Sequence, residues 1–189
     1  MNPYVAIGEG LWALMFAYWF AKRILGTKPT IRSTPLKEAL RFRVPWVLGF
    51  ALVFVPFSPG FLGMQILPSL GWLKASGVGL CFLGLAFSVW ARNTLGTNWS
   101  SAVTVKADHQ LIQNGPYSLS RHPIYSGFLL AFVGMVLCIG ELRALAGLAS
   151  LWFSYEVKVR VEERFMAEQF GEAYAQYAAR VSKLVPFVY

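Results

Sequence analysis

The side chains that can do chemistry are concentrated in one short stretch, residues 115–127, which reads GPYSLSRHPIYSG. It holds His122, one of two histidines in the chain, together with Arg121 and two tyrosines. Imidazole, guanidinium and phenol groups can bind an anion, hold a cation against an aromatic face, or carry a proton. Pro123 suits the first turn of a helix and keeps the residue before it extended. We therefore expect a loop that presents these side chains at the start of a helix near Pro123.

A second charged stretch, residues 156–165, reads EVKVRVEERF and follows an apolar run. The short link at residues 141–143 forces the helix after it to return antiparallel to the one before it, so the two polar helix ends meet at one membrane face. We expect one pocket there, lined by Tyr117, Arg121, His122, Tyr125, Lys158, Arg160, Glu162 and Glu163. The alternative is a rim of ordinary salt bridges, with the tyrosines as an aromatic belt.

The elements that position these residues are membrane helices. Hydrophobic residues make up 56% of the 189 residues and charged residues 14%, which is unlike a soluble domain. Apolar runs fall at residues 3–21, 44–57, 61–73, 75–91, 123–140 and 144–155. Spans of about 20 residues cross a bilayer, so we predict an all-α, polytopic membrane helix bundle with about five transmembrane helices. It carries a polar cytoplasmic loop, residues 92–121, and a C-terminal amphipathic helix.

Two stretches inside these runs raise separate points. Residues 44–73 contain three prolines that break a straight helix. One kinked span with a hydrophobic cap fits them, and so does a span followed by a re-entrant piece. In the run at residues 75–91, Gly77, Gly79 and Gly84 permit close helix packing. Gly171 is a predicted break in the C-terminal helix.

Basic residues give the orientation. Segments 22–43 and 92–121 and the tail from residue 158 carry 15 of the 17 lysines and arginines, leaving only Lys74 and Arg143 elsewhere. The positive-inside rule then places the N-terminus outside and the C-terminus in the cytoplasm. The net charge of +8 reflects this topology and contact with anionic membrane lipid, not nucleic-acid binding. Two lone cysteines in apolar runs lack metal-ligand spacing, so we expect no metal site.

The motif G-x-Y-x3-R-H-P-x-Y-x-G at residues 115–127 resembles the signature of the isoprenylcysteine carboxyl methyltransferase family, which is related to the phospholipid methyltransferases. H-x-L-I at residues 109–112 matches upstream of it. Downstream, the pair Glu162-Glu163 and F-G-E-x-Y-x2-Y at residues 170–177 match in order and spacing. The resemblance covers roughly residues 92–186, about half of the chain. It divides the chain into N-terminal transmembrane helices (1–91) and a catalytic region (92–189).

The resemblance implies an integral membrane enzyme that uses S-adenosylmethionine without a soluble Rossmann domain. Cofactor contacts then fall on His109, Gln110, Leu111, Ile112, Tyr117, His122, Pro123, Ile124, Tyr125 and Glu163. The family's substrate-binding arginine falls on Lys158, which lacks the planar two-pronged grip of arginine, although Arg160 lies two residues further on. Lys158, Arg160 and Glu163 are the candidate catalytic residues.

The expected acceptor is lipophilic: a prenylated molecule with an isoprenylcysteine-like carboxylate, another lipophilic small molecule, or a lipid headgroup. A carboxylate acceptor needs a cation and no base, whereas an amine needs Glu163 or His122 to take its proton, and a thiol remains possible. Two other functions stay open at this point. One is a nicotinamide-dependent membrane reductase of related fold, and the other is a non-catalytic membrane scaffold or small transporter.

Overall fold

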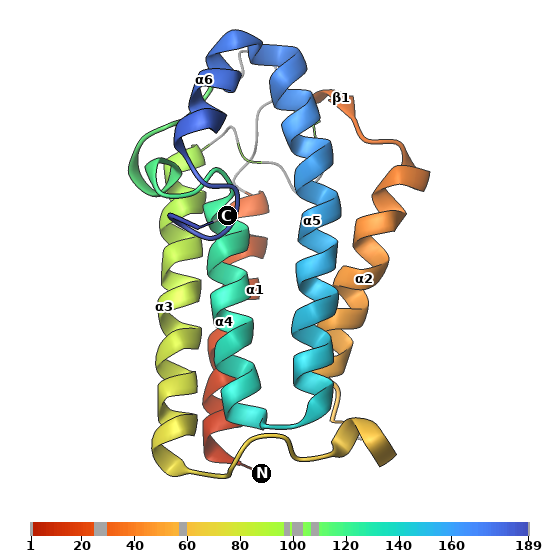
Figure 1. The fold of residues 1–189 in the computed structure, drawn as a ribbon, viewed down its shortest axis with the longest axis vertical. Coiled ribbons are helices and arrows are strands. Elements are labelled where there is room, and N and C mark those ends of the chain that lie inside the picture. Colours follow the sequence, from red (N-terminus) through yellow and green to blue (C-terminus); the bar gives the residue numbers. More distant parts are fainter. Residues whose placement is uncertain are drawn as a thin grey trace.

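The long helices of the chain stand side by side and alternate in direction (Figure 1). The computed structural model describes residues 2–24, 30–56, 60–96, 99, 104–106 and 110–188. In chain order the elements are α1 (Pro3–Ile24), β1 (Thr30–Ser33), α2 (Leu36–Phe54), the 3-10 turn η1 (Gly60–Gly63), α3 (Gly71–Leu95), β2 (Thr104–Lys106), the 3-10 turn η3 (Gly115–Ser118), α4 (Pro123–Ile139), α5 (Leu142–Phe170) and α6 (Glu172–Arg180). The predicted all-α membrane bundle is confirmed.

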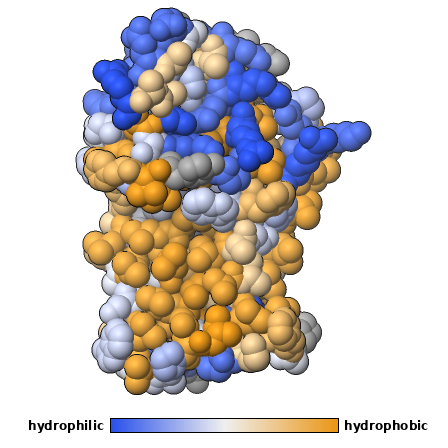
Figure 2. All heavy atoms as spheres, viewed as in Figure 1, coloured by the Kyte–Doolittle hydropathy of each residue, from blue (hydrophilic) through white to orange (hydrophobic). Residues whose placement is uncertain are grey.

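The outside of the bundle matches a lipid environment. Apolar side chains cover its lower two-thirds, and hydrophilic ones gather at the upper end, where α6 lies (Figure 2). Among the described residues, α1 and α3 are long and apolar enough to cross a membrane, and α4 is a shorter apolar helix. Phe20 and Leu14 of α1 are more than two-thirds exposed, which is favourable in contact with lipid and costly in water. The chain is a multi-pass integral membrane protein.

Glycines set the close approach of α3 and α4. A Cβ added to Gly77 would lie 2.6 Å from the carbonyl oxygen of Gly134, and Gly84 faces Gly127 in the same way two turns further along. Without side chains between them, the two backbones come into van der Waals contact. The prediction for Gly77 and Gly84 is therefore confirmed. It is wrong for Gly79, where an added Cβ meets nothing within 4 Å, because Gly79 faces away from α4.

The other long helix pair, α2 and α5, uses the same device. A Cβ added to Gly49 would lie 2.9 Å from the carbonyl oxygen of Gly147. The hydroxyl of buried Ser154 on α5 donates a 2.7 Å hydrogen bond to the carbonyl of Phe42 on α2. A hydrogen bond of this kind joins two helices without burying an unpaired polar group.

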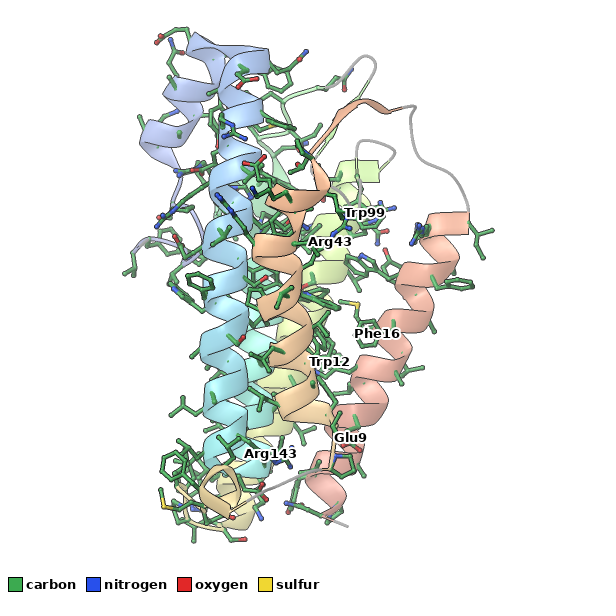
Figure 3. All side chains as sticks on the ribbon, turned by 90° about the vertical axis from the view of Figure 1, so that its right-hand side faces the viewer. Glu9, Trp12, Phe16, Arg43, Trp99 and Arg143 are labelled. Carbon is green, nitrogen blue, oxygen red and sulfur yellow. The ribbon has the colours of Figure 1, made fainter. Side chains whose placement is uncertain are left out.

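An aromatic cluster joins the two helix pairs to α1. Trp12 is 1% exposed, and its ring centroid lies 5.2 Å from those of Phe50 and Phe128 and 5.3 Å from that of Phe132. Figure 3 shows Trp12 reaching from α1 into the rest of the bundle. Since aromatic rings bury the most area per side chain, this cluster holds α1 against α2 and α4.

At the N-terminal end of the bundle, the chain between α2 and α3 folds across the α4–α5 link. The amide of Ile66 donates to the carbonyl of Gly140 at 2.8 Å, and the amide of Leu142 donates to Met64 at 2.9 Å. Buried Arg143 donates from Nη1 to the carbonyls of Leu52 and Val53, both at 3.0 Å. One of the two alternatives for residues 44–73 was a kinked span with a hydrophobic cap. It holds in part, because α2 is followed by a cap that contains only the 3-10 turn η1 before α3 begins at Gly71.

A small antiparallel ribbon is the one departure from the all-helical prediction among the described residues. Strand β1 pairs with β2, with Thr30 opposite Lys106 and Ser33 opposite Thr104. The ribbon connects the chain after α1 to the chain after α3. Strands of three and four residues are too short to produce a readable alternation, so the sequence pattern did not reveal them.

Candidate active site

The polar motif lies where the sequence predicts, in the turn that begins α4. Pro123 is the first residue of the helix, and His122 is its N-cap, with φ −126° and ψ 58°. The 3-10 turn η3 precedes it, starting at Gly115 with φ +58°, a conformation that glycine adopts without strain. Pro123 and Ile124 are buried in the first turn of this helix.

The C-terminal segment after α6 is hydrogen-bonded along this turn. The amides of Arg121 and His122 donate to the carbonyls of Ser182 and Lys183, at 2.8 and 3.2 Å. The hydroxyl of Ser120 donates to the same Lys183 carbonyl at 2.9 Å, and that of Ser126 donates to Leu184. The two segments, about 60 residues apart in sequence, thereby form one rigid unit around the start of α4.

Arg121 connects this unit to α5. Its Nε and Nη2 both lie 2.7 Å from Oε1 of Glu163, and its Nη1 donates to the carbonyls of Ala178 and Val181 at 2.9 and 2.5 Å. Those carbonyls end α6, where the helix dipole is negative and a cation is favourable. One guanidinium thus holds α4, α5 and α6 together.

His122 lies between two carboxylates of α5. Its Nδ1 is 3.3 Å from Oε2 of Glu162 and its Nε2 is 3.4 Å from Oε1 of Glu163. Burial alone would lower the pKa of His122, but hydrogen bonds and charge from the two glutamates outweigh it and raise the pKa. Burial would raise the pKa of Glu163, yet His122 and Arg121 lower it to about 2. The pKa of Glu162 is lowered likewise, by His122 and Lys158 against burial.

Tyr125 completes this polar cluster on the membrane side. Its hydroxyl donates to Oε1 of Glu162 at 2.6 Å. Its ring stacks on Tyr155 at 4.5 Å and on His122 at 5.8 Å between centroids, and Nζ of Lys158 lies 5.0 Å from its centroid. Nζ of Lys158 also lies 3.9 Å from Oε1 of Glu162. Phenol faces, a lysine and two carboxylates therefore share one small region at the ends of α4 and α5.

The other predicted cofactor residues have varied positions. Tyr117 is buried, and its carbonyl accepts a 2.7 Å hydrogen bond from the hydroxyl of Tyr177. Gln110 is exposed, and Leu111 and Ile112 are half-buried, with Ile112 packed against the main core. His109 lies outside the described residues.

Arg160 does not join the cluster. Its side chain is 75% exposed and lies 3.7 Å from Glu156, one turn earlier on α5. Glu162, in contrast, contacts His122, Tyr125 and Lys158. It is one of the residues predicted to line the pocket, although the predicted cofactor contacts and catalytic roles did not include it. Its spacing of four from Lys158 puts both side chains on one helix face.

The chain was then compared with known proteins. The sequence profile described as phospholipid methyltransferase matches residues 72–173, which is more than half of the chain. The chain belongs to the phospholipid methyltransferase family. The matched region includes the whole polar cluster at the ends of α4 and α5, from Arg121 to Glu163.

Individual members of this family resemble the chain at similar levels. Protein-S-isoprenylcysteine O-methyltransferase B of Arabidopsis thaliana is 32% identical over 120 residues, which is 62% of this chain and 61% of that protein. Protein-S-isoprenylcysteine O-methyltransferase of Saccharomyces cerevisiae is 34% identical over 112 residues, 58% of this chain and 47% of that one. The resemblance to the isoprenylcysteine carboxyl methyltransferases is thus confirmed.

A solved structure shows the same fold. The eukaryotic intramembrane Ras methyltransferase, an isoprenylcysteine carboxyl methyltransferase, superposes with a TM-score of 0.59 at 25% identity, over 84% of this chain and 55% of that chain. The chain thus spans about half to three-fifths of the relatives it matches.

Proposed function

We propose that this chain is an integral membrane methyltransferase that moves the methyl group of S-adenosylmethionine to a lipophilic acceptor. The acceptor is an isoprenylcysteine-like carboxylate or a lipid headgroup. The observation that carries the proposal is the polar cluster at the meeting ends of α4 and α5, made by the family's own motif residues. There, His122 lies within hydrogen-bonding reach of Glu162 and Glu163, and Tyr125 within reach of Glu162.

The residues present fit this cofactor. It carries a sulfonium and an ammonium cation, and the cluster offers two carboxylates whose pKa values are lowered, so both are ionised at neutral pH. Tyrosine faces attract cations, by about 0.5–2 kcal/mol each, and the ring of Tyr125 already lies 5.0 Å from the ammonium of Lys158. Leu111, Ile112 and the buried Tyr117 provide apolar surface for the adenine. When bound, the cofactor supplies an electrophilic methyl group that a nucleophile takes in line.

Lys158 is the residue that we assign to the acceptor. Its Nζ lies beside Tyr125 and Phe42, 5.0 and 5.8 Å from their ring centroids, on the membrane side of the cluster. A cation there would orient an acceptor carboxylate, which is already ionised and needs no base. Arg160 is the weaker candidate because its side chain points to the exposed surface. An amine acceptor would need a base, and the low pKa of Glu163 and the raised pKa of His122 make both poor proton acceptors at neutral pH.

We infer that the polar end of the bundle faces the cytoplasm, where the water-soluble cofactor would enter, while the acceptor enters from the lipid. On this proposal residues 92–189 form the catalytic region and residues 1–91 provide its membrane support. The family match that begins at residue 72 supports including α3 in the framework of the site. Neither of the other functions considered from the sequence has a feature in the described residues that favours it.

The test measures cofactor binding first and methyl transfer to an acceptor second. Detergent-solubilised protein is titrated with S-adenosylhomocysteine and with NADPH, and binding of the first alone supports the proposal. Labelled S-adenosylmethionine is then supplied with an S-prenylated N-acetylcysteine or with phosphatidylethanolamine, and the methylated product is identified by mass. Glu163→Gln and His122→Gln should abolish binding of S-adenosylhomocysteine, while Glu172→Gln, an exposed glutamate on α6, should not. Binding of NADPH alone, or of neither, contradicts the proposal.

A further inference from the structure

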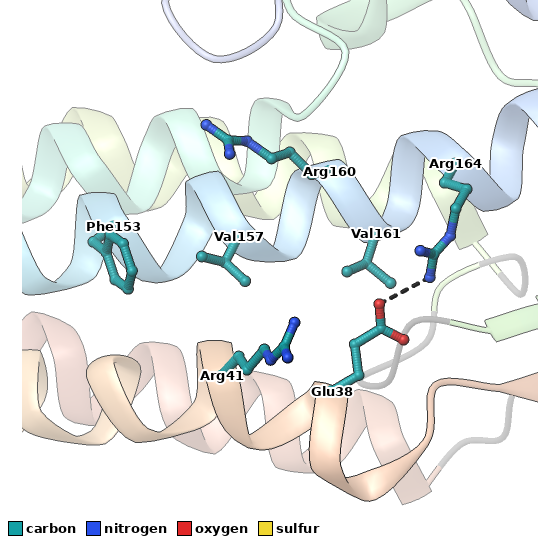
Figure 4. A pocket seen from close by; sticks show the side chains of 7 residues that line it. All are labelled: Glu38, Arg41, Phe153, Val157, Arg160, Val161 and Arg164. Carbon is teal, nitrogen blue, oxygen red and sulfur yellow. Dashed lines mark hydrogen bonds and ion pairs between the residues drawn. The ribbon is translucent and has the colours of Figure 1, made fainter.

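A groove of about 620 Å³ lies between α2 and α5, on a face that the proposed reaction does not use. Figure 4 shows Phe153, Val157 and Val161 following one another along α5, with Glu38 and Arg41 on α2 opposite them. The apolar residues form the part of the groove toward the middle of the bundle, and the charged ones lie at its polar end.

The apolar part faces outward. Phe153 is 58% exposed, and Val157 is half-buried. Such exposure on the rim of a membrane bundle is favourable only where hydrocarbon covers it. The apolar floor therefore suits the first segment of an acyl chain that lies parallel to α5.

The charged part carries an excess of positive charge. Three arginines and one glutamate line it, and three positive charges less one negative leave +2. Glu38 is matched already, because Nη2 of Arg164 lies 2.8 Å from its Oε1. Glu156, which approaches Arg160 at 3.7 Å, is also held by Lys183 at 3.2 Å. Figure 4 shows Arg160 pointing away from Arg41, on the other side of α5, so the unmatched charge that faces α5 across the groove belongs to Arg41.

Arg41 is the freer of the two. Among the residues that the structure describes, none forms a hydrogen bond or an ion pair with it. Figure 4 shows it between the two helices, near Val157 and Val161. A guanidinium binds a phosphate through two parallel hydrogen bonds, and here an apolar floor begins directly beside it.

The groove is separate from the polar cluster of the candidate active site. Phe42 and Val161 pack together with Ala39 and Phe165 in a small apolar cluster of their own. The ring of Phe42 also lies 5.8 Å from Nζ of Lys158. Lys158 and the other cluster residues are not among the residues that line the groove, so a ligand in the groove would not rest on them.

We propose that the groove between α2 and α5 binds an anionic membrane phospholipid, with its phosphodiester at Arg41 and an acyl chain along Phe153 and Val157. The complementary charge, the outward apolar floor and the position at the polar end of two membrane helices all match one ligand, a lipid with a negatively charged headgroup. The lipid is held and not methylated, so the inference does not depend on the proposed function.

The experiment is native mass spectrometry of the full chain in detergent, with added phosphatidylglycerol or phosphatidylcholine of identical acyl chains. Each arginine near an anionic headgroup contributes on the order of a five-fold gain in affinity. We expect Arg41→Gln to weaken phosphatidylglycerol binding about five-fold. Phosphatidylcholine binding should not change. Arg41 is exposed, so folding should be intact in its variants. Arg41→Lys, which keeps the positive charge, should keep most of the preference for phosphatidylglycerol.

Arg23→Gln is the matched control, because Arg23 is exposed at the same polar end but on α1, which packs against α3 and α4. It removes the same charge and should leave lipid binding unchanged. The inference is overturned if Arg23→Gln weakens phosphatidylglycerol binding as much as Arg41→Gln does. It is also overturned if the wild type binds phosphatidylglycerol and phosphatidylcholine equally well. So does full competition by inorganic phosphate or by an S-prenylated cysteine, since either would show a different occupant.

Discussion

Glu162 and Glu163 are neighbours on α5 but contact different parts of the polar cluster. Glu163 contacts Arg121 and His122, which belong to the turn before α4. Glu162 contacts Tyr125 and Lys158 on the membrane side and the other imidazole nitrogen of His122. Adjacent helix residues point about 100° apart, so one pair of glutamates serves both sides of a single imidazole.

The first prediction concerns Glu163. Glu163→Gln keeps the shape but removes the charge that faces Arg121, whose side chain is only 13% exposed. Losing charged hydrogen bonds at a part-buried site costs about 1–3 kcal/mol, so the variant should melt at a lower temperature in detergent. Glu172→Gln at the start of α6 is the control and should melt like the wild type. Equal melting of all three proteins would contradict a structural role for the ion pair.

The second prediction is a pH dependence. The pKa of His122 is raised above its usual 6.5 in the folded chain, so its stabilising charge is fully present below about pH 6.5 and is lost as the pH rises through the folded pKa. Glu163, with a pKa of about 2, stays ionised throughout this window. Its contribution is lost only in strong acid, as the pH falls from about 4.5 toward 2.

The wild type should therefore lose melting temperature as the pH rises above about 6.5, through the raised pKa of His122. His122→Gln removes the titrating group, and the difference between the two proteins isolates its effect from other groups. The variant should be less stable at the acid end and should show a flatter profile. A profile as steep as that of the wild type would mean that another group titrates in this window.

The sequence showed which residues are polar and near helix ends, but not which way they point. Lys158 and Arg160 looked equivalent because both are basic and two residues apart. Two residues on a helix differ in direction by about 200°, so Lys158 faces Tyr125 while Arg160 faces outward. Their relation to α4 depends on how α5 is rotated about its axis, and that rotation is set by packing at residues such as Gly147.

At the scale of the elements, the helix pairs depend on glycines at the crossing points, which gives the third prediction. Gly77→Ala puts a Cβ 2.6 Å from the carbonyl oxygen of Gly134 and 2.9 Å from Sγ of Cys138. Backbone must move to accept it, at a cost of about 1–3 kcal/mol. Gly79→Ala on the same helix meets nothing within 4 Å and should cost nothing, or stabilise α3 by up to about 1 kcal/mol.

Thermal unfolding in detergent measures both variants against the wild type. The two substitutions add the same methyl group to the same helix, two residues apart, so any general effect of alanine on helix formation cancels in the comparison. If both variants melt together, the close approach of α3 and α4 does not limit stability.

Element boundaries followed the local chemistry closely where that chemistry was strong. Helix α4 begins at Pro123 and α5 ends before Gly171, with φ +49°, as expected. Pro45 is different, because it lies inside α2. Residues of the interfacial segment before it join the helix, since Phe42 and Ala39 find a core against α5. Local propensity cannot show such a contact in advance.

At the scale of the whole molecule, the two ends of the bundle use their charges differently. At the end where the N-terminus lies, Arg143 caps the last carbonyls of α2 and Glu141 accepts from its Nε at 2.6 Å, so its charge is used internally. At the other end, β1, which carries Arg32, pairs with β2, which carries Lys106 and lies against α5 (Figure 1). The charge asymmetry read from the sequence therefore coincides with the two ends of the fold.

The last prediction tests orientation. The alternating helices place Met64 of the α2–α3 link at one end of the bundle and Ala175 of α6 at the other, and both are exposed. The two native cysteines, Cys81 and Cys138, are buried and should stay unlabelled. With the basic end in the cytoplasm, an impermeant maleimide added to intact cells should label Met64→Cys at once.

Ala175→Cys should react only after the membrane is opened, and the wild-type chain is the blank. The reverse pattern would invert the orientation and move the proposed cofactor entry to the outer face. Labelling of both variants in intact cells would instead show that the two ends lie on the same side of the membrane, which an odd number of crossings between them does not allow. Met64 precedes α3, α4 and α5, so the result depends on those three helices all spanning the bilayer.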